Sequence, residues 1–218
     1  MFKLWPWLEA NKNRLIGAAL AVAAAAALYS FLSWRHDQTE INAGQALTQL
    51  MVSPPSGATV EQSADAFAQV AANYAGTMAA QRAQLQAAAD YFSAGRYADA
   101  QVQFQKALAA NSTGALGATA ALGGASSLEA QGKLDDAANA YRQVVSQFAD
   151  EAAALPAKFA LGRIAEQQGK YTEATSFYQE LARNNLAGSL ASEAAMRALE
   201  IKSKLPAAPK PAGAPIAK

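Results

Sequence analysis

The side chains that could do chemistry are few in this 218-residue sequence, and they do not converge. There is no cysteine and a single histidine, His36, so disulfides, thiolate chemistry, histidine zinc sites and Ser-His triads are not expected. Adjacent carboxylates occur only near expected helix starts, at Asp135-Asp136 and Asp150-Glu151. There their negative charge interacts favourably with the positive end of the helix dipole. We therefore predict no catalytic residue and no metal site.

Signals for cofactors and nucleic acids are also missing. The stretch ALGGASSLEAQG, residues 121–132, is rich in glycine but has no preceding strand and no phosphate-binding lysine. Gly123 and Gly124 are expected to ease helix packing. The formal net charge is +1, so the chain has no strong field that would attract nucleic acid. We predict no cofactor, no small-molecule substrate, no nucleic-acid partner and no enzymatic activity.

What the sequence does carry is a repeat. GRYADAQVQFQKAL begins at Gly95, GKLDDAANAYRQVV at Gly132 and GKYTEATSFYQEL at Gly169, at intervals of 37 residues. Each copy opens with glycine, a basic residue and a bulky side chain, followed at fixed spacings by an alanine and an aromatic ring. A constant period of this size indicates stacked structural repeats.

Each repeat is predicted to be a pair of helices; in the last, they span about 154–168 and 172–184. Gly169 supplies the left-handed turn that ends the first helix. Aromatic rings of the second helices are expected to fill the space between one pair and the next, and small residues let the helices of a pair approach. A single pair cannot bury its apolar face, so the pairs must stack into an α-solenoid. The rings are Phe104, Tyr141 and Tyr178, and the small residues are Ala88, Ala125, Gly162, Ala100, Ala137 and Ala174.

Before and after the three repeats, which we place at 81–186, the helical pattern weakens. Residues 35–80 are expected to form a helical linker and a degenerate first repeat, with a helix at about 59–74. Residues 187–205 read as a capping helix whose Leu190, Ala194 and Leu199 cover the end of the stack. The Pro/Ala-rich tail 206–218 has almost nothing to bury and is expected to be disordered.

A membrane helix is predicted near the amino terminus. Residues 15–34 form an uncharged run of 20, about the length that crosses roughly 30 Å of hydrocarbon. Lysines and arginines are more frequent in segment 1–14 than just after the run, which predicts a single-pass topology with a cytoplasmic amino terminus. The alternative is a cleaved signal peptide, with small residues at 23–27 for the peptidase. The apolar run continues beyond them to Trp34, which favours an uncleaved anchor.

The repeats resemble the tetratricopeptide family. Three features depart from the pattern: the usual tryptophan of the first helix is absent, Ser112 replaces the closing proline of the first repeat, and the period is 37 rather than 34. The resemblance implies helix pairs that present a concave protein-binding surface. The third repeat keeps Leu161, Gly162, Gly169, Tyr171, Ala174 and Tyr178 at the family's spacing, and the first keeps Tyr91, Gly95, Tyr97, Ala100, Phe104 and Ala107.

The whole arrangement is similar to the YfgM family. A short basic segment and one span are followed by a degenerate start near YAGTMAAQRAQLQAAADYF and by three repeats. The resemblance implies a bacterial inner-membrane protein with periplasmic repeats, which associates with the Sec translocon and with a membrane-anchored periplasmic chaperone of the prolyl-isomerase type.

The first helices of the repeats should line the concave surface, which could hold an extended peptide or a partner helix. The same apolar residues could instead be ordinary core between helices. Leu85 and Ala89 stand where related domains place the Lys and Asn that grip a chaperone's terminal carboxylates, so such a clamp is not expected. The candidate protein-binding residues are Arg82, Leu85, Ala89, Phe92, Leu122, Ser126, Glu129, Phe159, Arg163 and Glu166.

The sequence therefore predicts a non-enzymatic, membrane-anchored scaffold. Two other functions share its layout. In a structural accessory subunit of another membrane complex, the small residues at 21–27 would pack the span against neighbouring helices. In an import receptor of mitochondria, the repeats would face the cytosol.

Overall fold

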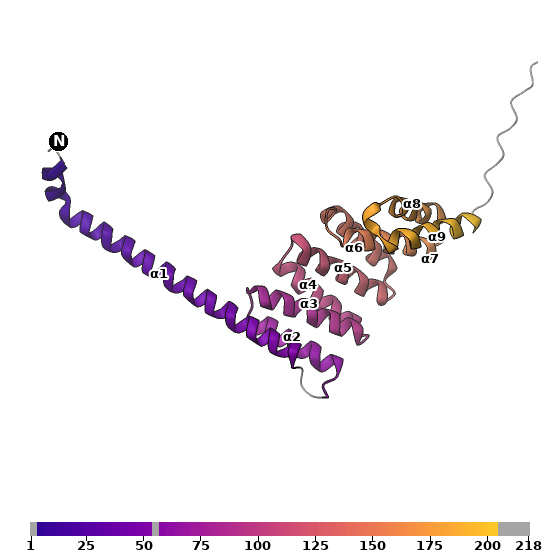
Figure 1. Cartoon of the computed structure of the whole chain (residues 1–218), viewed down its shortest axis with the longest axis horizontal. Coiled ribbons are helices and arrows are strands. Elements are labelled where there is room, and N and C mark those ends of the chain that lie inside the picture. The colour runs from indigo at the N-terminus through magenta and orange to yellow at the C-terminus, as the bar shows by residue number, and fades with distance from the viewer. Residues whose placement is uncertain (1–3, 54–56, 205–218) are drawn as a thin grey trace, which may run out of the picture.

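Every regular element in the described part of the chain is helical. The structure, a computed structural model, describes residues 4–53 and 57–204, with the backbone alone at 4–6, 8 and 10. A long first helix leads into a stack of antiparallel helices (Figure 1). The predicted all-α class, an amino-terminal helix followed by a solenoid, is confirmed. The elements are α1 Leu4–Val52, α2 Val60–Asn73, α3 Met78–Ser93, α4 Tyr97–Ala110, α5 Gly114–Ala130, α6 Leu134–Gln147, α7 Ala154–Gln167, α8 Tyr171–Ala182, the 3-10 turn η1 Asn185–Ala187 and α9 Ser189–Lys204.

The 37-residue period of the sequence is also the period of the helices. The second helices of successive pairs, α2, α4, α6 and α8, begin at Val60, Tyr97, Leu134 and Tyr171. Three of them follow a glycine, Gly95, Gly132 or Gly169, whose φ lies between 71 and 77°. Glycine adopts this left-handed backbone at little cost, whereas a residue with a Cβ is strained there. The turn inside each of these pairs therefore falls at the same point of the repeat.

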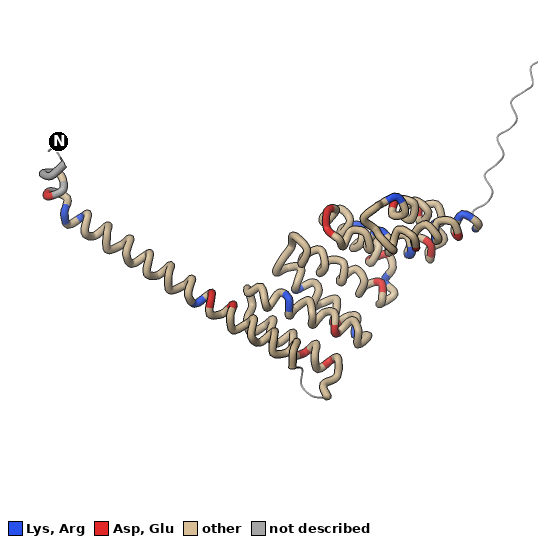
Figure 2. The backbone as a smooth tube through the Cα atoms, in the orientation of Figure 1, with Lys and Arg blue, Asp and Glu red and all other residues tan. Residues whose placement is uncertain are grey.

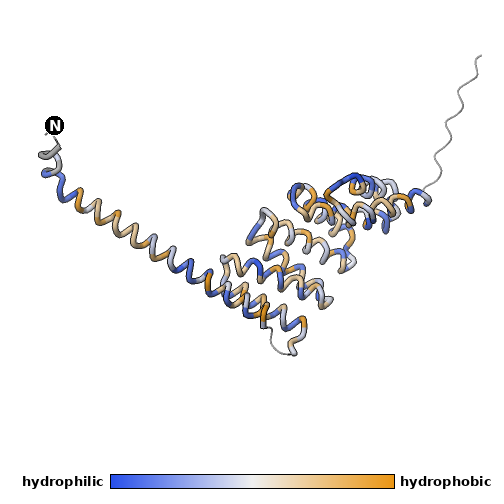
Figure 3. The backbone as a smooth tube through the Cα atoms, in the orientation of Figure 1, coloured by the Kyte–Doolittle hydropathy of each residue, from blue (hydrophilic) through white to orange (hydrophobic). Residues whose placement is uncertain are grey.

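Helix α1 runs without a break through the predicted span and into the repeats. Its 49 residues rise about 74 Å at 1.5 Å per residue. It is long and apolar enough to span a membrane, and the rest of the described chain does not cover that part. Figure 3 shows the apolar stretch, and Figure 2 shows charges at both of its ends. The predicted span and the linker helix after it are one helix, because neither proline nor glycine occurs between Trp34 and Ala43.

The last turns of α1 pack as the first helix of the degenerate repeat. Ala43 and Leu47 are buried in a cluster with Phe67 of α2 and with alanines of α3. In addition, the Glu40 carboxylate accepts a hydrogen bond from the backbone N–H of Met78, at 2.9 Å from Oε1. A carboxylate beside the first N–H groups of a helix stabilises that helix end. Helix α1 is therefore joined to the stack by side-chain contacts as well as by the chain.

The core is built from alanines and from one ring per pair. Ala100, Ala137 and Ala174 have no exposed surface, so the paired helices approach closely as predicted. Tyr141 lies in a cluster that joins α5, α6 and α7, and Tyr178 in one that joins α7, α8 and α9. These rings fill the space between one pair and the next, as the sequence analysis expected.

The capping helix differs from the prediction in one respect. α9 follows α7 by about one period, so it corresponds to the first helix of a further pair. Ala194, Ala198 and Ile201 are buried against the stack, whereas Leu199 is 70% exposed. The prediction that Leu199 covers the end was wrong, because it occupies the position of Gly162, which faces the second helix of its own pair. The tail 206–218 lies outside the described residues.

Candidate protein-binding groove

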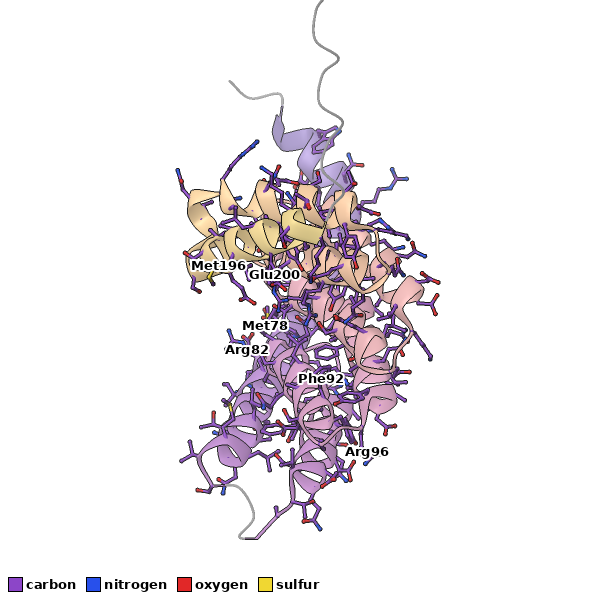
Figure 4. The ribbon with its side chains drawn as sticks, turned by 90° about the vertical axis from the view of Figure 1, so that its right-hand side faces the viewer. Met78, Arg82, Phe92, Arg96, Met196 and Glu200 are labelled. Atoms are coloured by element: carbon purple, nitrogen blue, oxygen red, sulfur yellow. The ribbon has the colours of Figure 1, made fainter. Side chains whose placement is uncertain are left out.

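Two adjoining hollows lie along the first helices of the pairs. Because Arg163 and Gln167 border both of them, they form one channel, which we call the inner groove. Figure 4 labels Phe92 within the stack. The larger hollow, about 640 Å³, is lined by Phe92, Ser126, Glu129, Ala130, Gly132, Leu134, Tyr141, Arg163 and Gln167. The smaller, about 360 Å³, is lined by Arg163, Glu166, Gln167, Tyr171, Arg197 and Lys204.

Equivalent helix positions meet in this groove because the pairs repeat every 37 residues. Ser126 and Arg163 occupy one such position, and Glu129 and Glu166 occupy the next one along the same face. Residues three apart on a helix lie side by side on its surface. The regular stacking therefore lines up four polar side chains from α5 and α7 along the groove.

In the larger hollow, the carboxylate of Glu129 is held from two sides. The hydroxyl of Tyr141 on α6 donates to Oε2 of Glu129 at 2.7 Å, and Ser126 Oγ lies 3.0 Å from the same hydroxyl. Nη2 of Arg163, on the next pair, lies 2.5 Å from Oε1 of Glu129. Only 15% of the Glu129 side chain is exposed, so the ion pair is less screened than a surface pair. It links successive pairs across the groove.

The same arrangement recurs one period later with longer distances. The hydroxyl of Tyr178 donates to Oε2 of Glu166 at 3.3 Å, and Nζ of Lys204 on α9 lies 3.7 Å from Oε1 of Glu166. The Glu166 side chain is 17% exposed. Each groove carboxylate thus has a tyrosine of its own pair and a cation from the first helix of the next pair.

Burial raises the pKa values of both tyrosines above the ordinary value of about 10. It raises the pKa of Tyr178 to about 12, with a further contribution from the Glu166 charge, and it is also the largest cause of the raised pKa of Tyr141. Both hydroxyls are therefore hydrogen-bond donors at neutral pH.

The inner groove combines paired charges with an apolar end. Its charges largely neutralise one another, so it has little net field toward an acidic or basic ligand. At one end it is apolar, where Phe92 packs edge-on against Tyr97 at 5.1 Å between ring centroids. Among the residues that the structure describes, no group of three His, Asp or Glu could hold a metal ion. Apolar contact with a few fixed polar groups suits an extended chain or a helix.

Comparison with known proteins identifies the architecture. The family described as Tetratricopeptide repeat-like domain matches residues 5–202, nearly the full chain. This chain belongs to that family. No protein of curated function matches the sequence.

One solved structure supports the same fold for this tetratricopeptide repeat-like protein. A tetratricopeptide repeat protein from Parabacteroides merdae superimposes with a TM-score of 0.58 at 11% identity, over 77% of this chain and 61% of that one. This chain therefore spans about three fifths of the length of that protein. A putative kinesin light chain with TPR-like repeats from Podosopora anserina gives a TM-score of 0.48 at 16% identity, over 78% and 93% of the two chains. Repeats of this family imply a protein-interaction scaffold.

The predicted groove residues of this tetratricopeptide repeat-like protein fall into three groups. Arg82 and Ala89 are exposed on α3 outside both hollows, and Figure 4 shows Arg82 beside Met78. Three apolar residues, Leu85, Leu122 and Phe159, are half-buried against the cores, as ordinary packing requires. The residues that line the inner groove are Phe92, Ser126, Glu129, Arg163 and Glu166.

Tyr141 and Lys204 also line the inner groove, although neither was predicted to do so. A signal for Tyr141 exists: in the two pairs whose groove position is Glu129 or Glu166, the core ring 12 residues later is tyrosine, whereas Phe92 is followed by Phe104. At these three positions the hydroxyl occurs only where a carboxylate can accept its hydrogen bond. Lys204 had no such signal, because it reaches Glu166 only through the packing of α9.

Proposed function

We propose that this protein is a membrane-anchored adaptor, whose repeats bind partner proteins in the bacterial periplasm and link the Sec translocon with a membrane-anchored periplasmic chaperone. The span 15–34 would lie in the inner membrane with the amino terminus in the cytoplasm. The excess of basic residues before the span supports this orientation. The resemblance to the YfgM family supports the identity of the two partners.

The observation that carries the proposal is the position of the inner groove relative to α1. Packing of α1 against the repeats begins at Ala43, nine residues beyond Trp34, or about 13 Å along a helix. The stack then extends to the side of α1 rather than along its axis (Figure 1). A partner in the groove would thus be held close to the membrane surface, where another membrane complex could meet it.

Photocrosslinking in intact membranes tests the groove and the partners together. A photoreactive residue at Phe92, inside the groove, should crosslink to a translocon or chaperone subunit. The control is the same probe at Val102, which is 47% exposed on α4 outside the groove. Equal crosslinks from both positions would reject the groove, and the absence of translocon and chaperone subunits from both would reject the partners.

Protease protection in sealed vesicles tests the topology. Residues beyond the span should be protected in inside-out inner-membrane vesicles and digested after detergent is added. Digestion before detergent would place the repeats on the cytosolic side, as in a mitochondrial import receptor.

A structural accessory subunit is the second candidate function. The small residues at 21–27 of α1 favour close helix contact, and no described residue covers them. If a variant without the repeats stays bound to one large membrane complex, the span is the interface and this candidate is preferred.

A further inference from the structure

A second pocket lies on the side of α5 opposite the inner groove. Gly124 and Leu128 border this pocket, whereas Ser126, two residues from either, borders the groove. Two residues along a helix are about 200° apart, so the two cavities are on opposite faces. The pocket measures about 230 Å³ and is lined by Gln101, Phe104, Gln105, Leu108, Ala120, Ala121, Gly124, Ala125, Leu128, Ala140, Gln143 and Gln147.

Small residues at two repeat positions leave this pocket open. One period further on, Gly124 corresponds to Leu161 and Ala140 corresponds to Phe177. Leu161 is 3% exposed in the core between α5, α6 and α7, and Phe177 packs against that core. The junction of α6, α7 and α8 is therefore filled by two large side chains at the positions where the junction of α4, α5 and α6 has only a glycine and an alanine.

At one repeat position, that of Ala121, the neighbouring junctions also have a polar bridge and this junction has none. At the position of Ala121, the preceding pair has Gln84, which donates a hydrogen bond to Gln103 of α4. The following pair has Lys158, whose Nζ lies 2.5 Å from Oε1 of Glu180 on α8. The methyl group of Ala121 can form neither kind of bridge. The opening thus follows from the side chains of this junction and not from the repeat itself.

The rim of the pocket consists of four glutamines. Gln101 and Gln105 are one turn apart on α4, and Gln143 and Gln147 are one turn apart on α6. Gln101 accepts a hydrogen bond from Gln131 at 2.9 Å; within the described chain, the amides of the other three bond to no other side chain. A glutamine amide both donates and accepts, so it can pair with the N–H and C=O groups of a peptide backbone without any charge.

We propose that this pocket binds one apolar side chain of an extended, uncharged polypeptide segment, while the rim glutamines hydrogen-bond the backbone on either side. An apolar cavity of about 150 Å³ holds a benzene molecule, so this pocket is large enough for a leucine or phenylalanine side chain. The absence of Lys, Arg, Asp and Glu from its lining means that a charged side chain would be desolvated without a partner. This site is separate from the inner groove and does not depend on the proposed function.

Ligand-observed NMR with blocked heptapeptides tests the proposal on the full chain in detergent. The probes are Gly/Ser peptides with Leu, Phe or Asp at the centre. Saturation transfer from the protein to the central Leu or Phe is expected, and it should be at least about tenfold weaker for Asp, because an unpaired charge is excluded from an apolar pocket. If the three peptides give equal transfer, or none gives any, the proposal is wrong.

A pair of variants locates the binding. Gly124→Leu copies Leu161 into the pocket; a Cβ at Gly124 meets nothing closer than Phe104 Cβ at 3.8 Å, so the fold should persist. Gly124→Leu should abolish the saturation transfer. Ala140→Phe, which introduces the residue found at the equivalent position Phe177, should abolish it too. Val102→Ala, at a side chain that is 47% exposed on α4 outside both cavities, is the control and should leave it unchanged. Transfer that persists in Gly124→Leu would overturn the proposal. A lower oligomeric mass in Gly124→Leu than in the wild type would also overturn it, because the occupant of the pocket would then be a second copy of the chain.

Discussion

At the scale of single residues, the ring of Phe104 distinguishes two adjacent glycines. A Cβ at Gly123 would lie 2.3 Å from Phe104 Cε1 and Cζ, whereas a Cβ at Gly124 would be in ordinary contact. Gly123 is therefore the point where α5 approaches the preceding pair. Both glycines were predicted to ease helix packing, and only Gly123 has that role.

This difference predicts opposite effects of the same substitution. Gly123→Ala should lower the free energy of unfolding by about 1–3 kcal/mol, because the methyl group overpacks the junction. Gly124→Ala should raise it by up to about 1 kcal/mol through helix propensity. Urea unfolding of both variants, followed by circular dichroism, measures the contrast. If the two variants have equal stability, the close approach at Gly123 is not real.

The buried tyrosines predict a loss of stability at alkaline pH. The pKa values of Tyr91 and Tyr178 are raised to about 12, mainly by burial, above the ordinary value of about 10. The folded protein thus holds these protons more tightly than the unfolded chain. The resulting stability is complete below pH 10 and is lost as the pH rises through 12.

Absorbance of tyrosinate during a pH titration tests this prediction. Part of the absorbance change should appear only near pH 12, together with unfolding, and it should be smaller in Tyr178→Phe than in the wild type. A titration that is complete well below pH 12 in the folded protein would contradict it.

At the scale of elements, the junction of α1 with α3 depends on Glu40. Its carboxylate accepts from the first backbone N–H of α3, a contact between residues 38 positions apart. Glu40→Ala should lower stability by about 0.5–1 kcal/mol, the usual value of a charge or cap at a helix end.

The junction itself can be observed by pulsed EPR between labels on α1 and α3. In Glu40→Ala the distribution of distances should broaden, whereas Glu40→Gln keeps an acceptor and should broaden it less. An unchanged distribution in both variants would mean that the apolar contacts of Ala43 and Leu47 alone fix the helix.

At the scale of the whole molecule, α1 belongs to two environments. Its first part is uncovered by the described chain, and its last turns are part of the repeat core. The boundary of the folded unit is therefore inside the helix, not at the end of the span.

Two truncations test this division. A chain that begins at His36 should keep the stability of the repeats to within about 0.5 kcal/mol, because it loses only the uncovered part. A chain that begins at Ser53 should be less stable by about 3 kcal/mol or more, since it loses the buried Leu47 side chain together with Ala43 and the Glu40 cap. Thermal melting of the two fragments measures this difference. Equal melting temperatures would contradict the claim that the last turns of α1 are part of the repeat core.

The sequence by itself determined the class of fold, the period and the turns. Gly95, Gly132 and Gly169 impose a left-handed turn, and the alanines and rings that follow at fixed spacings impose close helix pairs, so these features are local and repeat along the chain. Segment 15–34 and the linker within 35–80 were each predicted to be helical for the same reason: the pattern of neighbouring residues contains that information.

Only the tertiary structure decided which side chains meet. Glu129 and Arg163 are 34 residues apart and Glu40 and Met78 are 38 apart, and their contacts exist because the stacking brings equivalent faces together. The sequence also did not reveal which side of α9 carries Leu199, or that a pocket opens beside Gly124. Both follow from what the adjoining helices contribute at the corresponding positions, which the properties of one segment cannot specify.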